Sequence, residues 1–277
     1  MTSGLSSLNK VNLLKHLTKH AYNGEIQLPR TSVDILDNFN ICDGKYKSKR
    51  VDKDKAVRSK VEEFMLDNFY AIAPVPVVLE LYKDRKMTEY LEDEFNLWSS
   101  CGVSFGLFDG EKVAGAGLNL FVAKPVEDNV DYVRAKDWHN LAAELATSQT
   151  FHNPVYCWRN SQFLHLQHFN QHNIKVHGAS FGLHLGCLSL GEEYRGKDQI
   201  THLLIRAICN KVWDQGGVIT TVANFPAFEK YLRKHFPNNV HLVDSVKYKD
   251  LELTINGRRV FKPLEILDNI RYLALVR

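Results

Sequence analysis

The sequence predicts a mixed α/β fold, and three observations support this fold class. Short apolar runs typical of strands alternate with segments whose apolar residues recur at the helical period. Between residues 183 and 235 the order is strand, basic turn, helix, strand and helix. The C-terminal part contains further strand-like runs around the tight-turn pair Asn256–Gly257. With 277 residues and 44% hydrophobic residues, the chain can form one large domain with a substantial core.

The first part of the chain is expected to begin with a strand and two helices. We predict the strand over residues 45–51 and a helix, capped by Asp52, that continues to about residue 70. Pro74 and Pro76 would end this helix. A second helix is expected over residues 77–97.

The pair Asp109–Gly110 lies between two apolar runs, which predicts a hairpin. We assign residues 1–44 to an N-terminal extension and residues 45–277 to the folded domain. The remaining predicted elements are helices near residues 133–145, 158–170, 199–213 and 227–235, and strands at residues 183–190, 218–223, 241–249 and 271–276.

Composition and charge narrow the class of protein. The formal net charge of +3 is too small to indicate nucleic-acid binding by itself. The five cysteines are dispersed without C-x-x-C spacing, which indicates reduced thiols in a cytosolic or nuclear protein. No apolar run reaches membrane-spanning length. The leucines near the N-terminus are interrupted by lysines, which indicates a short amphipathic helix rather than a secretory signal. We therefore expect a cytoplasmic protein with no membrane association, monomeric or weakly dimeric.

The turn at Glu193–Gln199 is the first candidate site. A predicted strand precedes it, and the helix that follows has free amides and a partial positive charge at its N-terminus. Arg195 and Lys197 add full positive charges, so a pyrophosphate could bind there. A single glycine, Gly196, is weak evidence, and an ordinary turn with solvated charges explains the same residues.

Two sequence blocks, separated as they are in one superfamily of enzymes, are more specific evidence than the turn alone. The stretch YRGKDQI, residues 194–200, is similar to the cofactor turn of the GNAT superfamily of acyltransferases, which usually reads YRGKGIG. After the next strand, that family commonly places Asn, then Ala three residues on, Tyr seven on, and Gly-Phe eleven and twelve on. This chain has Asn224, Ala227, Tyr231 and His235–Phe236, and so departs only where His235 replaces the glycine.

Other segments resemble one branch of that superfamily. The stretch DGEKVAGAGL is similar to the central hairpin of the family. The segments EEFMLDNFYAIAPVP and VKYKDLELTINGRRVFKP resemble the insect-type and nematode arylalkylamine N-acetyltransferases, which acetylate small amines. The resemblance covers roughly residues 45–277. It implies a mostly antiparallel sheet with a splayed parallel pair, flanked by helices.

The resemblance also implies a cofactor, acetyl-CoA, and residues that hold it. Strand amides near Leu188 and Leu190 would pair with the pantetheine arm. The turn residues Arg195, Gly196, Lys197, Asp198, Gln199 and Ile200 would hold the pyrophosphate, and Asn224 begins the second family block. The acceptor would be a small amine that attacks the thioester directly, with backbone amides stabilising the oxyanion.

Three residues are candidates for the proton transfers. Tyr231 matches the tyrosine that protonates the leaving thiolate in the family, although a half-buried aromatic residue on an amphipathic helix explains it equally. His184 is the candidate base, because vertebrate arylalkylamine enzymes place a His-x-His pair on that strand and His184 lies at the first position. Gly186 lies at the second. A hydrogen-bonded core histidine is the alternative. Ser189, on the same strand, could relay a proton.

Three departures from the family pattern affect the site. Asp198 replaces a phosphate-binding glycine, and a carboxylate about 4 Å from a phosphate costs roughly 4 kcal/mol at an effective dielectric near 20. Ile200 replaces a small residue and could hinder close approach of the backbone. Ala73 lies before Pro74, where insect-type enzymes carry a catalytic glutamate. These changes suit either a diverged enzyme or a catalytically degenerate GNAT-fold binding or regulatory protein with weak or lost CoA binding.

Two further patterns are weaker. His165, His168 and His172 share one helix face and could bind zinc, but no other ligand cluster accompanies them, so we interpret them as a polar surface face. The basic run over residues 45–60 could contact nucleic acid. Interleaved aspartates and the lack of an aromatic stripe favour a solvated face there, so nucleic-acid binding is the least favoured hypothesis.

Overall fold

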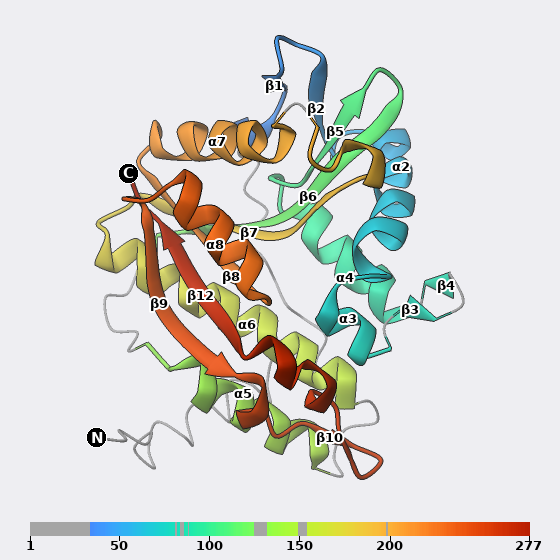
Figure 1. Cartoon of the computed structure of the whole chain (residues 1–277), viewed down its shortest axis with the longest axis vertical. Helices are drawn as coiled ribbons and strands as arrows, with labels where there is room; N and C mark the ends of the chain where they lie inside the picture. Colours follow the sequence, from blue (N-terminus) through green and yellow to red (C-terminus); the bar gives the residue numbers. More distant parts are fainter. Residues whose placement is uncertain are drawn as a thin grey trace.

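The computed structural model describes residues 34–80, 82–83, 86–87, 89–124, 132–148, 154–197 and 199–277. Its centre is a sheet of eight strands in the order β1-β2-β5-β6-β7-β8-β12-β9 (Figure 1). All neighbouring strands in this sheet are antiparallel except β7 and β8, which are parallel. The strands are β1 (Asn40–Ile41), β2 (Tyr46–Arg50), β5 (Phe105–Asp109), β6 (Lys112–Ala123), β7 (Phe181–Leu190), β8 (Gly217–Ala223), β9 (Val240–Lys247) and β12 (Asn269–Leu275). The mixed, mostly antiparallel sheet expected from the sequence is confirmed.

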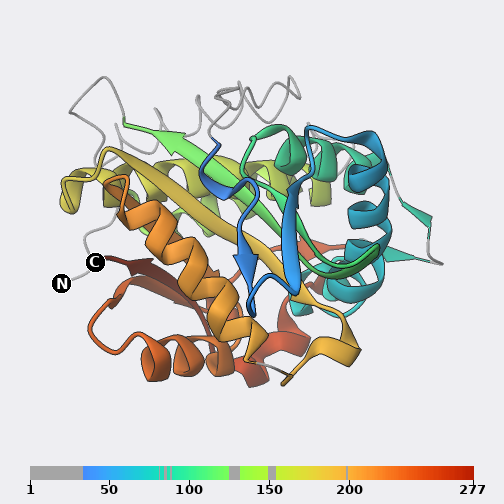
Figure 2. The ribbon, with the colours of Figure 1, turned by 90° about the horizontal axis from the view of Figure 1, so that it is seen from above.

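Helices cover both faces of this sheet. Figure 2 shows α7 and α6 on opposite faces of β7 and β8. Both helices bury an apolar side against the strands, which is how most helices in globular proteins gain stability. The helices are α2 (Lys55–Met65), α3 (Pro74–Val78), α4 (Glu89–Ser100), α5 (Ala135–Thr147), α6 (Pro154–Val176), α7 (Ile200–Trp213) and α8 (Pro226–His235). Two small hairpins, β3 (Tyr82–Lys83) with β4 (Lys86–Met87) and β10 (Thr254–Ile255) with β11 (Arg258–Arg259), lie outside the main sheet.

The first helices differ from the sequence prediction. Asp54, not Asp52, caps α2, and its side chain accepts hydrogen bonds from two amides of the first turn. A π-helical segment, Leu66–Tyr70, continues α2. Pro74 begins α3 at its first position, where the missing N–H of proline costs nothing. The single helix predicted over residues 77–97 is wrong, because Glu80 has a φ of 52° that a helix cannot continue through.

The described residues before Lys45 pack with the domain. Strand β1 extends the sheet beside β2, and Ile35, Leu36 and Phe39 are buried in the main core. Of the extension predicted for residues 1–44, therefore, residues 34–44 contact the sheet, and residues 1–33 lie outside the described residues.

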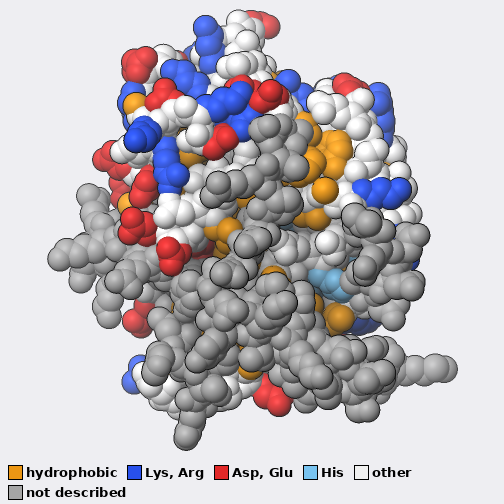
Figure 3. All heavy atoms as spheres, turned by 180° about the vertical axis from the view of Figure 1, so that it is seen from behind, with side chains coloured by type: hydrophobic (Ala, Val, Ile, Leu, Met, Phe, Trp, Pro, Cys, Tyr) orange, Lys and Arg blue, Asp and Glu red, His pale blue; other side chains and the backbone are white. Residues whose placement is uncertain are grey.

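Three basic residues of the run over residues 45–60, namely Arg50, Lys53 and Lys60, pair with acidic side chains. Arg50 is buried and contacts Asp34 and Asp52, and Lys53 contacts Asp34 and Asp37. On the face seen in Figure 3, acidic and basic side chains of the described residues are interspersed. That nucleic-acid binding is the least favoured hypothesis stays a prediction. Across the described ranges, no helix has both the length and the apolar character needed to cross a membrane.

Candidate active site

The parallel strands β7 and β8 separate at Gly186. Leu185 pairs with Thr221 in the last parallel contact, and beyond it the two strands share no register. On the other side of β7, β6 skips Gly186, because Leu118 pairs with Cys187 and Asn119 with Leu185. This β-bulge bends β7 away from β8. Backbone groups of β7 beyond the bulge therefore face a gap rather than a neighbouring strand.

A cavity of about 490 Å³ opens on the α7 and α8 side of this gap. Its walls combine β7 and β8 with side chains from both helices and from the loop before α3. Ile72 and Phe225 border it and are 55% and 41% exposed. Its lining residues include Phe69, Ala73, Gly186, Leu188, Ser189, Leu190, Arg195, Thr201, Val222 and Asn224.

A second, smaller cavity of about 100 Å³ lies on the α5 and α6 side. It is lined mainly by aromatic and buried polar side chains, among them Trp98, His139, Trp158, Arg159, His184, Cys187 and Tyr272. Four residues, Phe69, Gly186, Val222 and Asn224, line both cavities. The gap between β7 and β8 is therefore the place where the two cavities meet.

The predicted cofactor residues lie around the larger cavity. Leu188, Leu190, Arg195 and Asn224 line it. Gly196, Lys197 and Gln199 are exposed in the turn that leads into α7. Ile200 is 1% exposed, so its side chain packs in the core under α7 rather than over the turn. The prediction for Asp198 falls on a residue outside the described ones.

The turn before α7 contains two residues with a left-handed backbone. Gly196 has a φ of 75°, and Gln199, at the N-cap of α7, has a φ of 53°. The side chain of Arg195 is fixed across the turn, because its Nε donates to the carbonyl oxygen of Leu190 at 3.0 Å. A guanidinium and the N-terminus of a helix of 14 residues thus flank the same cavity.

His184 lines the smaller cavity and is 2% exposed. Its Nδ1 lies 2.9 Å from the hydroxyl oxygen of Thr220, and that hydroxyl donates to Oδ1 of Asn170 at 2.8 Å. Because the single hydroxyl proton goes to Asn170, Nδ1 of His184 must donate, which leaves Nε2 with a free lone pair. Burial lowers the pKa of His184 to about 3, so the imidazole is neutral.

Ser189 and Tyr231 occupy different surroundings. Ser189 lines the larger cavity, and its hydroxyl donates to the carbonyl oxygen of Asn68 at 2.6 Å. That bond ties β7 to the π-helical segment. Tyr231 lies on α8 with its ring 4.5 Å from that of His235, and burial raises its pKa. It is not among the residues that line either cavity as the structure describes them.

Ala73 lines the larger cavity directly before α3.

The carboxylate of Glu94, which the sequence analysis did not single out, pairs with a residue that lines the smaller cavity. Glu94 is buried, and Arg159, which lines the smaller cavity, donates to both of its oxygens, from Nη2 at 2.6 Å and from Nε at 3.2 Å. Tyr70 also donates to Glu94, at 3.3 Å. The positive charge of Arg159 compensates the buried negative charge of Glu94. In the sequence, the pair was indicated only by the presence of two charged residues on otherwise apolar helix faces.

The three histidines of α6 form no solvated face, so that prediction is wrong. His165 is fully buried, and burial lowers its pKa well below the usual value. His168 and His172 are half-buried and stack on the ring of Tyr132, at 5.9 and 4.5 Å between centroids. Within the described ranges, no group of three or more His, Cys, Asp or Glu residues is arranged to hold a metal ion.

Comparison with known proteins defines the class of fold. No protein-family model and no curated protein matches the sequence. Solved structures do match. Arylalkylamine N-acetyltransferase 2 from Aedes aegypti superposes with a TM-score of 0.60 at 16% identity, over 83% of this chain and 98% of that one. Polyamine N-acetyltransferase from Drosophila melanogaster gives 0.57 at 13% identity, over 84% and 100%.

A third match, a putative arylalkylamine N-acetyltransferase 7 from Aedes aegypti, has a TM-score of 0.53 at 14% identity and covers 91% of this chain and 97% of that one. The chain therefore has the GNAT fold of arylalkylamine and polyamine N-acetyltransferases, as its resemblance to this superfamily implied.

Proposed function

We propose that this protein is an acetyl-CoA-dependent N-acetyltransferase that acts on a small amine, with aralkylamines as the favoured class. The observation that carries the proposal is the gap at Gly186. It joins a large cavity flanked by a guanidinium and a helix N-terminus to a small cavity lined by aromatic side chains. Such an arrangement brings a long anionic donor and a small acceptor together from opposite faces of the sheet.

The residues around the larger cavity suit an acyl-CoA. Its apolar walls and the free edge of β7 near Leu188 and Leu190 fit an extended pantetheine arm. The side chains of Arg195 and Lys197 and the positive end of the α7 dipole would hold the pyrophosphate. Bound acetyl-CoA would supply the acetyl group as a thioester.

The small cavity suits an amine that reacts in its neutral form. Acetyl transfer forms an N–C bond and breaks the C–S bond, and one amine proton ends on the released thiol. Nε2 of His184 is a proton acceptor on this side of the gap, although its low pKa makes it a weak base. We assign it to receive the proton as the amine attacks. Ser189 and Tyr231 are kept as candidate relay and acid for the thiolate.

The alternative is a GNAT-fold protein that has lost catalysis and serves a binding or regulatory role. Ala73 favours it, because a methyl group borders the larger cavity where insect-type enzymes carry the catalytic glutamate. Asp198 favours it as well, because a carboxylate in the cofactor turn would repel phosphate.

Calorimetric titration of acetyl-CoA into the purified protein tests the proposal first. Binding in the micromolar range, followed by turnover in a screen of tryptamine, tyramine and agmatine, would support an enzyme. Micromolar binding without turnover of any amine would support the binding-protein alternative. Failure to bind at millimolar acetyl-CoA would overturn the acetyltransferase assignment.

A further inference from the structure

The phenol of Tyr272 is a buried polar group on the acceptor side of the gap. Tyr272, on β12, is 2% exposed and lines the smaller cavity. Its backbone pairs with Val222 of β8, which is the first residue of β8 beyond the last contact with β7. Directly opposed residues of adjacent strands present their side chains on the same face, so the phenol is placed beside the opening of the gap.

His139 holds this phenol. Nε2 of His139, on α5, lies 2.7 Å from the hydroxyl oxygen of Tyr272. Burial lowers the pKa of His139 to about 3, so the imidazole is neutral and carries one proton. Its Nδ1 is buried without a hydrogen-bond partner among the described residues. A buried N–H without a partner is costly and rare, whereas an unpaired acceptor is tolerated more often.

The proton of His139 therefore resides on Nε2, which donates to the oxygen of Tyr272. This tautomer leaves the hydroxyl hydrogen of Tyr272 without a protein acceptor among the described residues. Trp98, which lines the same cavity, likewise has a buried indole N–H with no described partner. The cavity thus offers two hydrogen-bond donors without a described protein partner, which a ligand oxygen could accept.

We infer that the Tyr272 hydroxyl, positioned by His139, donates a hydrogen bond to the acetyl carbonyl oxygen and stabilises the negative charge that develops there. This inference rests on the proposed acetyl transfer. Burial raises the pKa of Tyr272 well above its usual value, so the phenol keeps its proton while it donates. A fixed donor in a site without bulk water stabilises an oxyanion strongly because it needs no reorientation during the reaction. Tyr231, on the outer helix α8, takes no part in this step.

The direct test is the carbon-13 resonance of acetyl-CoA labelled at the carbonyl carbon, recorded free and bound to the full-length protein. A hydrogen bond polarises the carbonyl and moves its resonance downfield. We expect a downfield shift with the wild-type protein that is lost in Tyr272→Phe and retained in Tyr231→Phe. Tyr132→Phe is the partly buried control, because Tyr132 donates to Asp244 at 3.0 Å and lines neither cavity as described.

Kinetics give the second readout. Tyr272→Phe should lower kcat by about 10²- to 10³-fold, as loss of one oxyanion donor does, with the Kd for acetyl-CoA changed less than threefold. His139→Leu should lower kcat less, because the phenol remains. If Tyr272→Phe fails to fold, 3-fluorotyrosine at position 272 replaces it. Its more acidic hydroxyl should move the carbonyl resonance further downfield.

The outcomes separate this inference from the proposed function. A wild-type protein that binds and transfers acetyl groups, with a resonance and kcat unaffected by Tyr272→Phe, would overturn the role of Tyr272 alone. An unchanged resonance in the fluorotyrosine protein would overturn it too. A wild-type protein that does not bind acetyl-CoA would overturn the proposed function, and the role of Tyr272 with it.

Discussion

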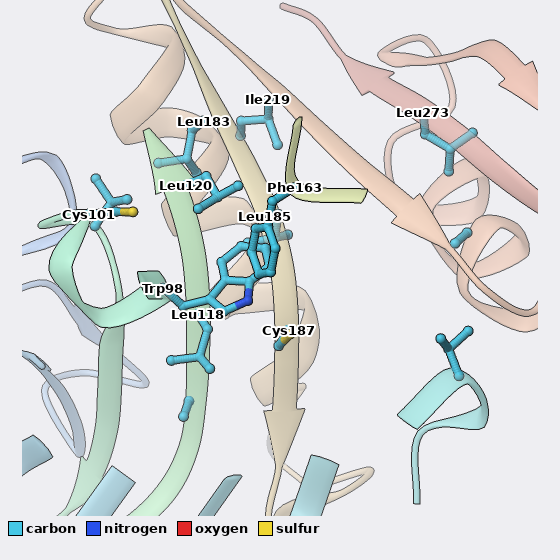
Figure 4. Close-up of a cluster of buried hydrophobic side chains, with 14 of the residues drawn as sticks. Trp98, Cys101, Leu118, Leu120, Phe163, Leu183, Leu185, Cys187, Ile219 and Leu273 are labelled. Carbon is cyan, nitrogen blue, oxygen red and sulfur yellow. The ribbon is translucent and has the colours of Figure 1, made fainter. Parts of the chain in front are cut away.

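The indole ring of Trp98 fills the space into which a side chain at Gly186 would project. A Cβ built on Gly186 would lie 2.5 Å from Cη2 and 2.6 Å from Cζ3 of Trp98, and 2.8 Å from the carbonyl oxygen of Leu118. Figure 4 shows the indole beside β7, in the cluster that includes Phe163, Leu185 and Cys187. The bulge therefore requires glycine, and the second histidine of the vertebrate His-x-His pair has no room here.

The first prediction concerns this contact. Gly186→Ala should lower the free energy of unfolding by about 1–3 kcal/mol, because the added methyl group must displace the Trp98 ring or the backbone of β6. It should also weaken acetyl-CoA binding, since Gly186 lines both cavities. Urea unfolding and calorimetry measure the two effects. Trp98→Leu removes the nearest atoms, so the alanine should cost less in that background, and equal costs in both would contradict the contact.

The second prediction concerns the buried pair of Glu94 and Arg159. Either Glu94→Gln or Arg159→Met leaves one uncompensated charge in the core, and each should cost about 3–5 kcal/mol of unfolding free energy. The double variant should cost clearly less than the sum of the two, since no charge remains buried. A double-mutant cycle from denaturant unfolding measures this coupling. Additive losses would show that the two residues do not interact.

The third prediction is a pH dependence of stability. His139 and His184 have folded-state pKa values of about 3, below the unfolded value near 6.5. Between these values the unfolded chain binds protons that the folded chain does not, so stability falls as pH falls from about 6.5 towards 3. Each histidine should contribute a slope of about 1.4 kcal/mol per pH unit within that window.

Denaturant unfolding at pH 7, 6, 5 and 4 measures this slope. The His184→Gln substitution should reduce this slope by about 1.4 kcal/mol per pH unit, the contribution of one histidine. This reduction is expected whatever the substitution does to stability at pH 7. Tyr132→Phe is the matched control, because it removes a part-buried hydrogen bond without removing a group that takes up a proton in this range. A slope unchanged by His184→Gln would contradict the buried neutral state of this histidine.

Most of the fold could be predicted because its signals are local. The Asp109–Gly110 turn and the helical period of α7 fix their elements through neighbouring residues, and both are observed. The break between α3 and α4 had no such signal. Helix α3 ends at a left-handed Glu80, a conformation for which glycine or asparagine is usual, so the sequence offered no stop signal.

Residues of the candidate site could be predicted only where they are close to one another in the sequence. The strand and turn from β7 into α7 are contiguous, so the sequence grouped Leu188, Leu190 and Arg195, and all three line the larger cavity. His139 and Tyr272 are 133 residues apart, and no local pattern links them. Gly186 carried a usable signal, because an isolated glycine within a strand often marks a bulge.

The last prediction concerns the charge balance of the cofactor turn. If Asp198 repels the pyrophosphate, Asp198→Asn should tighten acetyl-CoA binding by roughly tenfold, or about 1.4 kcal/mol. Asp198→Gly should tighten it further if the backbone also gains freedom to approach the phosphates. Arg195→Gln should weaken binding and make it less sensitive to salt, because one screened attraction is removed. Asp214→Asn, at the exposed opposite end of α7, is the control and should leave the affinity unchanged. If Asp198→Asn weakens binding instead, the carboxylate supports the turn, and the departure from the family glycine is an adaptation rather than a loss.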